Sequence, residues 1–122
     1  TFFVREDLVL GLDLSLVFEN GRLPFGDEAR AAAAPDGAKG AWTSDAMPVA
    51  QFRGTGGVIL ELIDAIVSVD VTQARPAVVR REALVGWLGR VLPRSIPMSE
   101  APAGQRGLVG FTGEGTVLVA GR

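Results

Sequence analysis

Two stretches of the chain share one pattern: FRGTGGVIL at residues 52–60 and FTGEGTVLV at residues 111–119. Each reads F-x-G-x-G-x-V and ends in two further aliphatic residues. Glycine tolerates positive φ and lets two backbones approach closely. Each copy therefore predicts a strand, a tight turn or bulge, and a second strand. The glycines expected at these structural turns are Gly54, Gly56, Gly113 and Gly115.

Length and composition indicate one β-rich domain. The 122 residues fit a single domain that can bury a sizeable core. Hydrophobic residues make up 48% of the chain and include many Val and Leu residues, which favours strands and argues against general disorder. The net charge of -2 provides no basic field that would attract nucleic acid or acidic lipid.

Three missing residue types limit the chemistry, because the chain contains no Cys, His or Tyr. A disulfide, a Ser-His-Asp triad, a Cys nucleophile and a zinc site with His or Cys ligands are all excluded. Carboxylate chemistry and oxygen-ligated metals stay open. We expect no catalytic residue, no metal and no cofactor, and we interpret the protein as a non-enzyme.

The sequence also carries signals about location. No run of about 20 apolar residues occurs, so we predict no membrane span, and no signal peptide is recognisable. Eleven of the twelve cationic residues are Arg, which together with the Ala, Gly and Val content is typical of a GC-rich bacterial genome. We expect a bacterial cytoplasmic protein. The chain starts at Thr1, without Met and inside a strand pattern, so we expect upstream residues to be missing.

Residues 8–18 have the clearest periodicity. Large apolar residues at every second position share one face of a strand: Leu8, Leu10, Leu12, Leu14, Leu16 and Phe18. We expect that face to join the core. Gly11 predicts a bend or bulge that divides the run into two strands, and Asn20-Gly21 predicts a hairpin turn at its end.

Residues 24–48 interrupt the strand pattern with three prolines and four consecutive alanines. They predict either a surface loop or a short helix from Asp27 to Ala34. Trp42 either pins this segment to the body, which we favour, or contacts a partner.

The following segments return to strands. Residues 49–71 are apolar on both faces for most of their length, which predicts a strand pair enclosed between two layers, with a break at 64–65. A strand over residues 77–87 continues in extended form to Ile96, and Pro93 restricts that part to an edge or an end. A linker over residues 98–107 precedes the second glycine hairpin.

The similarity of the glycine stretches extends to an internal duplication. Residues 5–9, REDLV, match residues 81–85, REALV, and a strand region and F-x-G-x-G-x-V follow each. We predict two related β units over about 1–63 and 77–122, with a loop inserted at 24–48. Two units of about four strands each favour an all-β domain, as a β-sandwich or a β-roll like a double-stranded β-helix.

These motifs resemble the AIM24 family. The resemblance rests on VRREALVGW at residues 79–87, GLVGFTGEGTVLV at 107–119 and VAQFRGTGGVIL at 49–60. It implies a double-stranded β-helix or β-roll of the type seen in the tryptophan RNA-binding attenuation protein. Bacterial members are mostly uncharacterised, and the eukaryotic member is mitochondrial and linked to inner-membrane organisation. The resemblance implies no catalytic residue, and it places a further family segment before Thr1.

Several alternative sites are weak on residue grounds. The glycine stretches lack the following helix that a dipole-assisted phosphate site needs. Arg and Glu in the pairs Arg5-Glu6 and Arg81-Glu82 would point to opposite faces of a strand, so we interpret them as solvent-facing or ion-paired. Asp64 and Asp70, with Ser68 between them, lack a third oxygen ligand for a cation.

The function expected from the sequence is that of a non-enzymatic oligomerising or scaffold module. Its partner is a second copy or another protein, in a closed dimer or trimer with an aliphatic interface that includes residues 57–71. The alternative is a small-molecule or nucleotide binding domain with a pocket between the two β units. RNA binding by fold analogy is disfavoured by the negative net charge, and we expect no nucleic acid.

Overall fold

The computed structural model describes residues 1–23, 46–62, 64–97, 99–102, 105 and 107–120. In this part of the chain all strand pairs are antiparallel, and the other regular element is one short 3-10 helix. The expected all-β fold is confirmed. The short helix expected over residues 27–34, and Trp42, lie outside the described residues.

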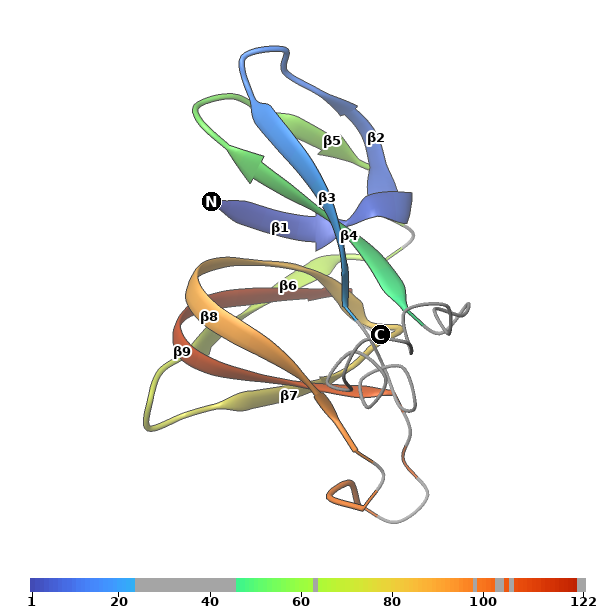
Figure 1. Ribbon diagram of the computed structural model, residues 1–122, viewed down its shortest axis with the longest axis vertical. Helices are drawn as coiled ribbons and strands as arrows, with labels where there is room; N and C mark the ends of the chain where they lie inside the picture. The colour runs from blue at the N-terminus through green and yellow to red at the C-terminus, as the bar shows by residue number, and fades with distance from the viewer. Residues whose placement is uncertain (24–45, 63, 98, 103–104, 106, 121–122) are drawn as a thin grey trace, which may run out of the picture.

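The strands form an upper and a lower group (Figure 1). The upper group contains β1 (Phe2–Arg5), the 3-10 helix η1 (Glu6–Leu8), β2 (Val9–Leu12), β3 (Val17–Leu23), β4 (Met47–Arg53) and β5 (Val58–Leu60). The lower group contains β6 (Ile66–Val71), β7 (Ala77–Arg80), β8 (Leu84–Ile96) and β9 (Leu108–Ala120).

One sheet runs through both groups, in the order β3-β4-β1-β8-β9-β6, and β7 also pairs with β9. Strand β1 joins the groups, because it pairs with β4 along one edge and with the beginning of β8 along the other. Strands β2 and β5 form a separate two-stranded sheet at the upper end of the molecule (Figure 1).

The two groups have matching registers when Phe52 is aligned with Phe111. Phe52 then has Phe2 as its strand partner where Phe111 has Ala77. The register shift at Val9/Gly11 coincides with the one at Leu84/Gly86. The backbone hydrogen bond from Glu61 to Leu8 coincides with the one from Ala120 to Ala83. We call residues at the same place in the two registers counterparts. The sequence match of Arg5 with Arg81 is one residue out of step, since Arg5 lies opposite Val49 and Arg80 lies opposite Leu108.

The larger core cluster surrounds Trp87. The Trp87 ring stacks on Phe3 with centroids 5.1 Å apart, and it meets Phe111 at a tilt with centroids 5.4 Å apart. A Cβ atom at Gly86 would collide with the carbonyl oxygen of Phe3, so glycine lets β8 lie close to β1 here. A second cluster, around Val4, Ala50, Phe52 and Val85, contains residues of both groups and packs them together.

The alternating run over residues 8–18 differs from its prediction. It divides into two strands, and a register shift lies beside Gly11, but the chain turns at 13–16. The core prediction is wrong, because four of the six residues are exposed: Leu10, Leu12, Leu14 and Phe18. The register shift and the turn interrupt the alternation, and no described element covers these four side chains.

Two turn predictions are wrong. Asn20 and Gly21 lie inside β3, opposite Ala50 and Val49 of β4, so the long β3–β4 pairing overrides the local turn preference. Gly113 and Gly115 lie inside the continuous strand β9 rather than in a turn, and the second glycine stretch is not a hairpin.

Three strand predictions have different outcomes. The strand expected over 77–87 is interrupted by a turn at 81–83. The enclosure expected for 49–71 holds for β4, most of whose residues are buried, but it is wrong beyond β4, because Ile59, Ile66 and Val67 are exposed. The edge position of Pro93 is confirmed, since that part of β8 pairs with β9 alone among the described strands.

Candidate functional site

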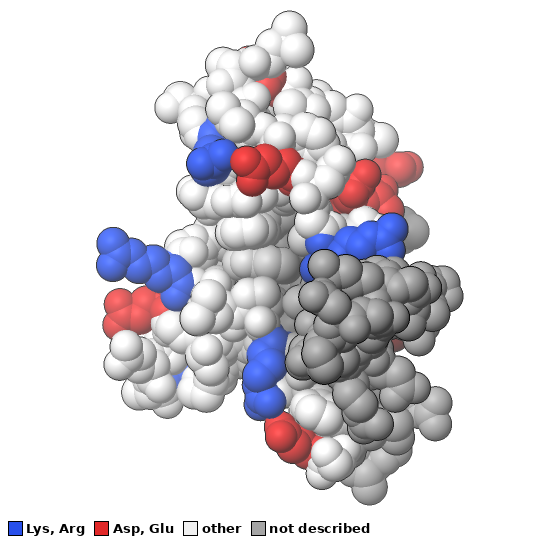
Figure 2. Space-filling view, viewed as in Figure 1, with Lys and Arg blue, Asp and Glu red and all other residues white. Residues whose placement is uncertain are grey.

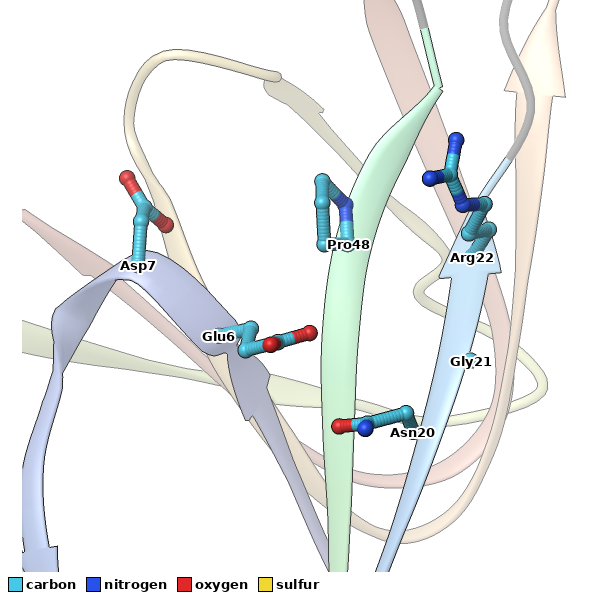
Figure 3. A pocket seen from close by; sticks show the side chains of 6 residues that line it. All are labelled: Glu6, Asp7, Asn20, Gly21, Arg22 and Pro48. Carbon is cyan, nitrogen blue, oxygen red and sulfur yellow. The ribbon is translucent and has the colours of Figure 1, made fainter. Parts of the chain in front are cut away.

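An open hollow of about 570 Å³ lies over β4, between η1 and β3. Its lining contains Glu6, Asp7, Asn20, Gly21, Arg22 and Pro48. Figure 3 shows Glu6 and Asn20 extending toward β4 from opposite sides, with Pro48 and Arg22 toward one end. The hollow is open to solvent, and all the residues that line it are exposed.

Arg5 organises the turn beside this hollow. Its guanidinium donates two hydrogen bonds to the Asp7 carboxylate, 3.1 Å from Nε to Oδ1 and 2.8 Å from Nη2 to Oδ2. Its Nη1 also donates to the backbone carbonyl of Glu82, at 3.4 Å. One side chain therefore ties the η1 turn of the upper group to the 81–83 turn of the lower group. Bidentate geometry makes this a directional contact.

Two smaller hollows lie between the groups, where these turns meet. One, of about 430 Å³, is lined by residues of both groups: Arg5, Asp7, Leu8, Glu61, Leu62, Asp64, Glu82, Leu84, Val85 and Ala120. The other, of about 390 Å³, includes both Arg81 and Glu82. The expectation that Arg81 and Glu82 point to opposite faces is wrong, because the two residues lie in a turn rather than a strand.

The charges around the larger of these two hollows favour no anionic ligand. Four carboxylates line it, and its one Arg already binds Asp7. A phosphate would meet net negative charge there. Within the described chain, no group of three potential metal-ligating side chains is found. Asp64 lines this hollow and Asp70 does not: Asp70 lies in β6 and accepts a hydrogen bond from the Thr116 hydroxyl at 3.4 Å.

A different surface is more distinctive. We define the apolar tip as the exposed large apolar residues of β2, β3, β5 and the turn after β2: Leu10, Leu12, Leu14, Val17, Phe18 and Ile59. Figure 2 shows mostly uncharged side chains at this upper end of the molecule. Leu14 is 98% exposed at the turn, and Ile59 is 64% exposed on β5. Large exposed apolar side chains that gather at one end of a molecule are typical of interaction surfaces.

Two residues of β2 in the apolar tip have buried counterparts, whereas Val17 and its counterpart Leu92 are both exposed. Leu10 is 64% exposed, whereas its counterpart Val85 is 1% exposed. Leu12 is also exposed, whereas its counterpart Trp87 lies in the core. The lower residues are covered because β8 packs against β1 and β9. Nothing in the described chain gives β2 an equivalent cover.

The glycines singled out by sequence help to shape this tip. Gly54, with φ +109°, and Gly56 lie in the connection between β4 and β5. The Ser15 hydroxyl donates to the carbonyl of Thr55 at 2.8 Å, which joins this connection to the 13–16 turn. Gly113 has nearly the same backbone angle as its counterpart Gly54, with φ +106°. These glycines therefore have backbone roles in the structure.

No protein-family model, curated protein or solved structure matches the chain. The described residues include no helix that is both long and apolar enough to cross a membrane.

Proposed function

We propose that this protein is a non-enzymatic β module of the AIM24 type that self-associates through its apolar tip. The observation that carries the proposal is the contrast between the exposed Leu10 and Leu12 and their buried counterparts Val85 and Trp87. Full burial of a Leu or Ile side chain contributes about 1.5–3 kcal/mol. Covering Leu10 and Ile59 on two subunits therefore supplies a substantial driving force for association.

The proposal includes two related units in the chain, over about 1–63 and 77–122. Their shared registers support it, as does the similar φ at Gly54 and Gly113. The proposal also keeps a bacterial cytoplasmic origin, which rests on composition alone.

Small-molecule binding is the second candidate, and the hollow of about 430 Å³ between the groups favours it. That volume falls in the range of ligand pockets, about 300–1,000 Å³. Its carboxylates favour a neutral or cationic compound over a nucleotide. A ligand series that raises the melting temperature, and loses the effect when Glu61 and Glu82 are both replaced by Gln, would support this candidate.

Multi-angle light scattering tests the leading proposal. We expect a closed dimer or trimer whose mass is stable between low and high salt, because aliphatic contacts are not screened as charges are. A chain that scatters at its monomer mass of 12.8 kDa across the concentration range would refute self-association. Arg53→Gln serves as a control, since it removes an exposed ion pair with Glu19 and leaves the apolar side chains in place.

A further inference from the structure

Strand β5 has one edge that no described strand pairs with. Its other edge pairs with β2, where the carbonyl of Gly57 accepts from the N–H of Asp13 and the N–H of Glu61 donates to Leu8. Successive residues of an antiparallel strand direct their backbone groups to alternate edges. The N–H and C=O groups of Val58 and Leu60 therefore face the unpaired edge.

The lower group shows that this edge can accept a strand. The counterparts of Val58 and Leu60 are Val117 and Val119 of β9, which lie opposite Val69 and Val67 of β6. Strand β6 thus fills the position on β9 that is unfilled on β5 in the described structure. An unpaired edge usually carries charge, proline or a bulge that blocks further pairing. Strand β5 reads Val-Ile-Leu and has no charged residue or proline.

We propose that β5 of a second copy of this chain pairs with β5 in antiparallel register across a twofold axis at Ile59. This inference rests on the self-association proposed above and names its contact. Val58 then exchanges hydrogen bonds with Leu60 of the partner subunit, and Ile59 lies opposite Ile59 of the partner subunit. A twofold contact uses the same patch on both copies and closes at two subunits.

The sequence around β5 is self-complementary in this register. From Gly54 to Leu60 no residue is charged, so no like charges face each other across the axis. Glu61 lies opposite Gly57 of the partner subunit, and no described atom lies within 4 Å of a Cβ built on Gly57. Leu10, in the neighbouring strand β2, adds a further exposed apolar side chain on each subunit.

Disulfide trapping tests this register without interference, because the chain contains no Cys. Residues opposite each other at a non-hydrogen-bonded position have Cα atoms about 4.5 Å apart, within the range of about 4.4–6.8 Å for a disulfide. Ile59→Cys should form a reducible dimer under mild oxidation. Leu10→Cys is the matched control, since Leu10 is also 64% exposed. In the proposed dimer β2 lies three strand spacings from β2 of the partner subunit, so the two Leu10 positions are roughly 14 Å apart.

We expect at least about tenfold more trapped dimer for Ile59→Cys than for Leu10→Cys, given a bridging limit of roughly 7 Å between Cα atoms. Equal trapping of the two variants would overturn the proposed register. Absence of trapping for Ile59→Cys, in a protein that still scatters as an oligomer, would overturn the β5 contact and leave self-association standing. A wild-type monomer would overturn both proposals. As a second measurement, Ile59→Lys should weaken the dimer at least about tenfold through opposed like charges, and unchanged association would contradict the contact.

Discussion

Replacing Gly113 with alanine should destabilise the fold, although the change adds only one methyl group. Gly113 lies in the middle of β9, opposite Val91 of β8, and has φ +106°. An alanine Cβ at this position would collide with the carbonyl oxygen of Arg90. That oxygen belongs to the backbone of the neighbouring strand, so it cannot move aside as a flexible side chain could.

The magnitude has two parts. An L-residue held in a sparsely populated φ/ψ region costs about 1–3 kcal/mol, and the forced shift of packed backbone adds about 1–3 kcal/mol. We expect a loss of about 3 kcal/mol in the free energy of unfolding, against a total of about 5–15 kcal/mol for a domain. The protein should fold but melt roughly 10 °C lower, at about 3–5 °C per kcal/mol for this size.

Gly57→Ala is the matched control from the other glycine stretch. Gly57 has no positive φ, and no described atom lies within 4 Å of its added Cβ. We expect its effect on the folding of a single subunit to stay within about 0.5 kcal/mol, as for most surface substitutions. Urea unfolding followed by Trp87 fluorescence, in a Trp42→Phe background and at fixed protein concentration, measures both variants. Equal stabilities for the two variants would refute the argument from backbone geometry.

Two further predictions concern stability. Arg5→Ala should lower the free energy of unfolding by about 1 kcal/mol, because it removes hydrogen bonds that tie the two groups together. Arg53→Ala, at an exposed ion pair, should lower it by no more than about 0.5 kcal/mol. Urea titration measures both variants, and equal losses would contradict the prediction. Phe111→Leu should lower the free energy of unfolding by about 1–3 kcal/mol, because Phe111 is fully buried. Phe18→Leu, at a half-exposed site, should cost less than half as much. Calorimetry measures both variants, and a larger loss for Phe18→Leu would contradict the assignment of Phe111 to the core.

The glycine stretches predicted strands correctly but could not predict how the strands pair. In the first stretch, the segments on either side of Gly54 and Gly56 pair with β3 and β2 rather than with each other. In the second stretch, a positive φ is absorbed inside a continuous strand. A glycine shows where the backbone is permissive. Whether the chain turns there depends on partners distant in sequence.

The leucine alternation over residues 8–18 shows a second limit of local reasoning. Period two establishes which side chains point the same way, but it contains no information about what lies above them. Burial of that face would require a covering element, and β1, β4 and β5 do not supply one for Leu10 or Leu14. The run with the clearest alternation therefore includes some of the most exposed large apolar side chains of the described structure.

The hollows are harder to predict from the sequence than the strands, because residues distant in the sequence line them. Arg5 was singled out as part of an Arg-Glu pair, yet its contacts are with Asp7 and with the backbone of Glu82, 77 positions away. Asn20, Arg22 and Pro48 join the hollow over β4 only because β3 and β4 pair along seven residues. No local sequence pattern predicts that these residues lie together. The repeated Arg-Glu pair does indicate residues that lie where the two groups are in contact, although they are not the strand residues that the sequence predicts.

The two register shifts show why the same local geometry leads to different surfaces. At Gly86, the absent Cβ makes room for the backbone of β1, so the shift in β8 lies at a buried junction between strands. At its counterpart Gly11, a Cβ would meet only the side chain of Ile59, at 3.8 Å. The β2–β5 and β8–β9 pairs have the same bulge, but among the described strands only the bulge of β8 has a neighbouring strand, β1, packed against it. A neighbouring strand therefore covers Val85 but, among the described residues, none covers Leu10. The second copy of β5 that we propose occupies a different place, the free edge of β5, which corresponds to the place of β6 beside β9.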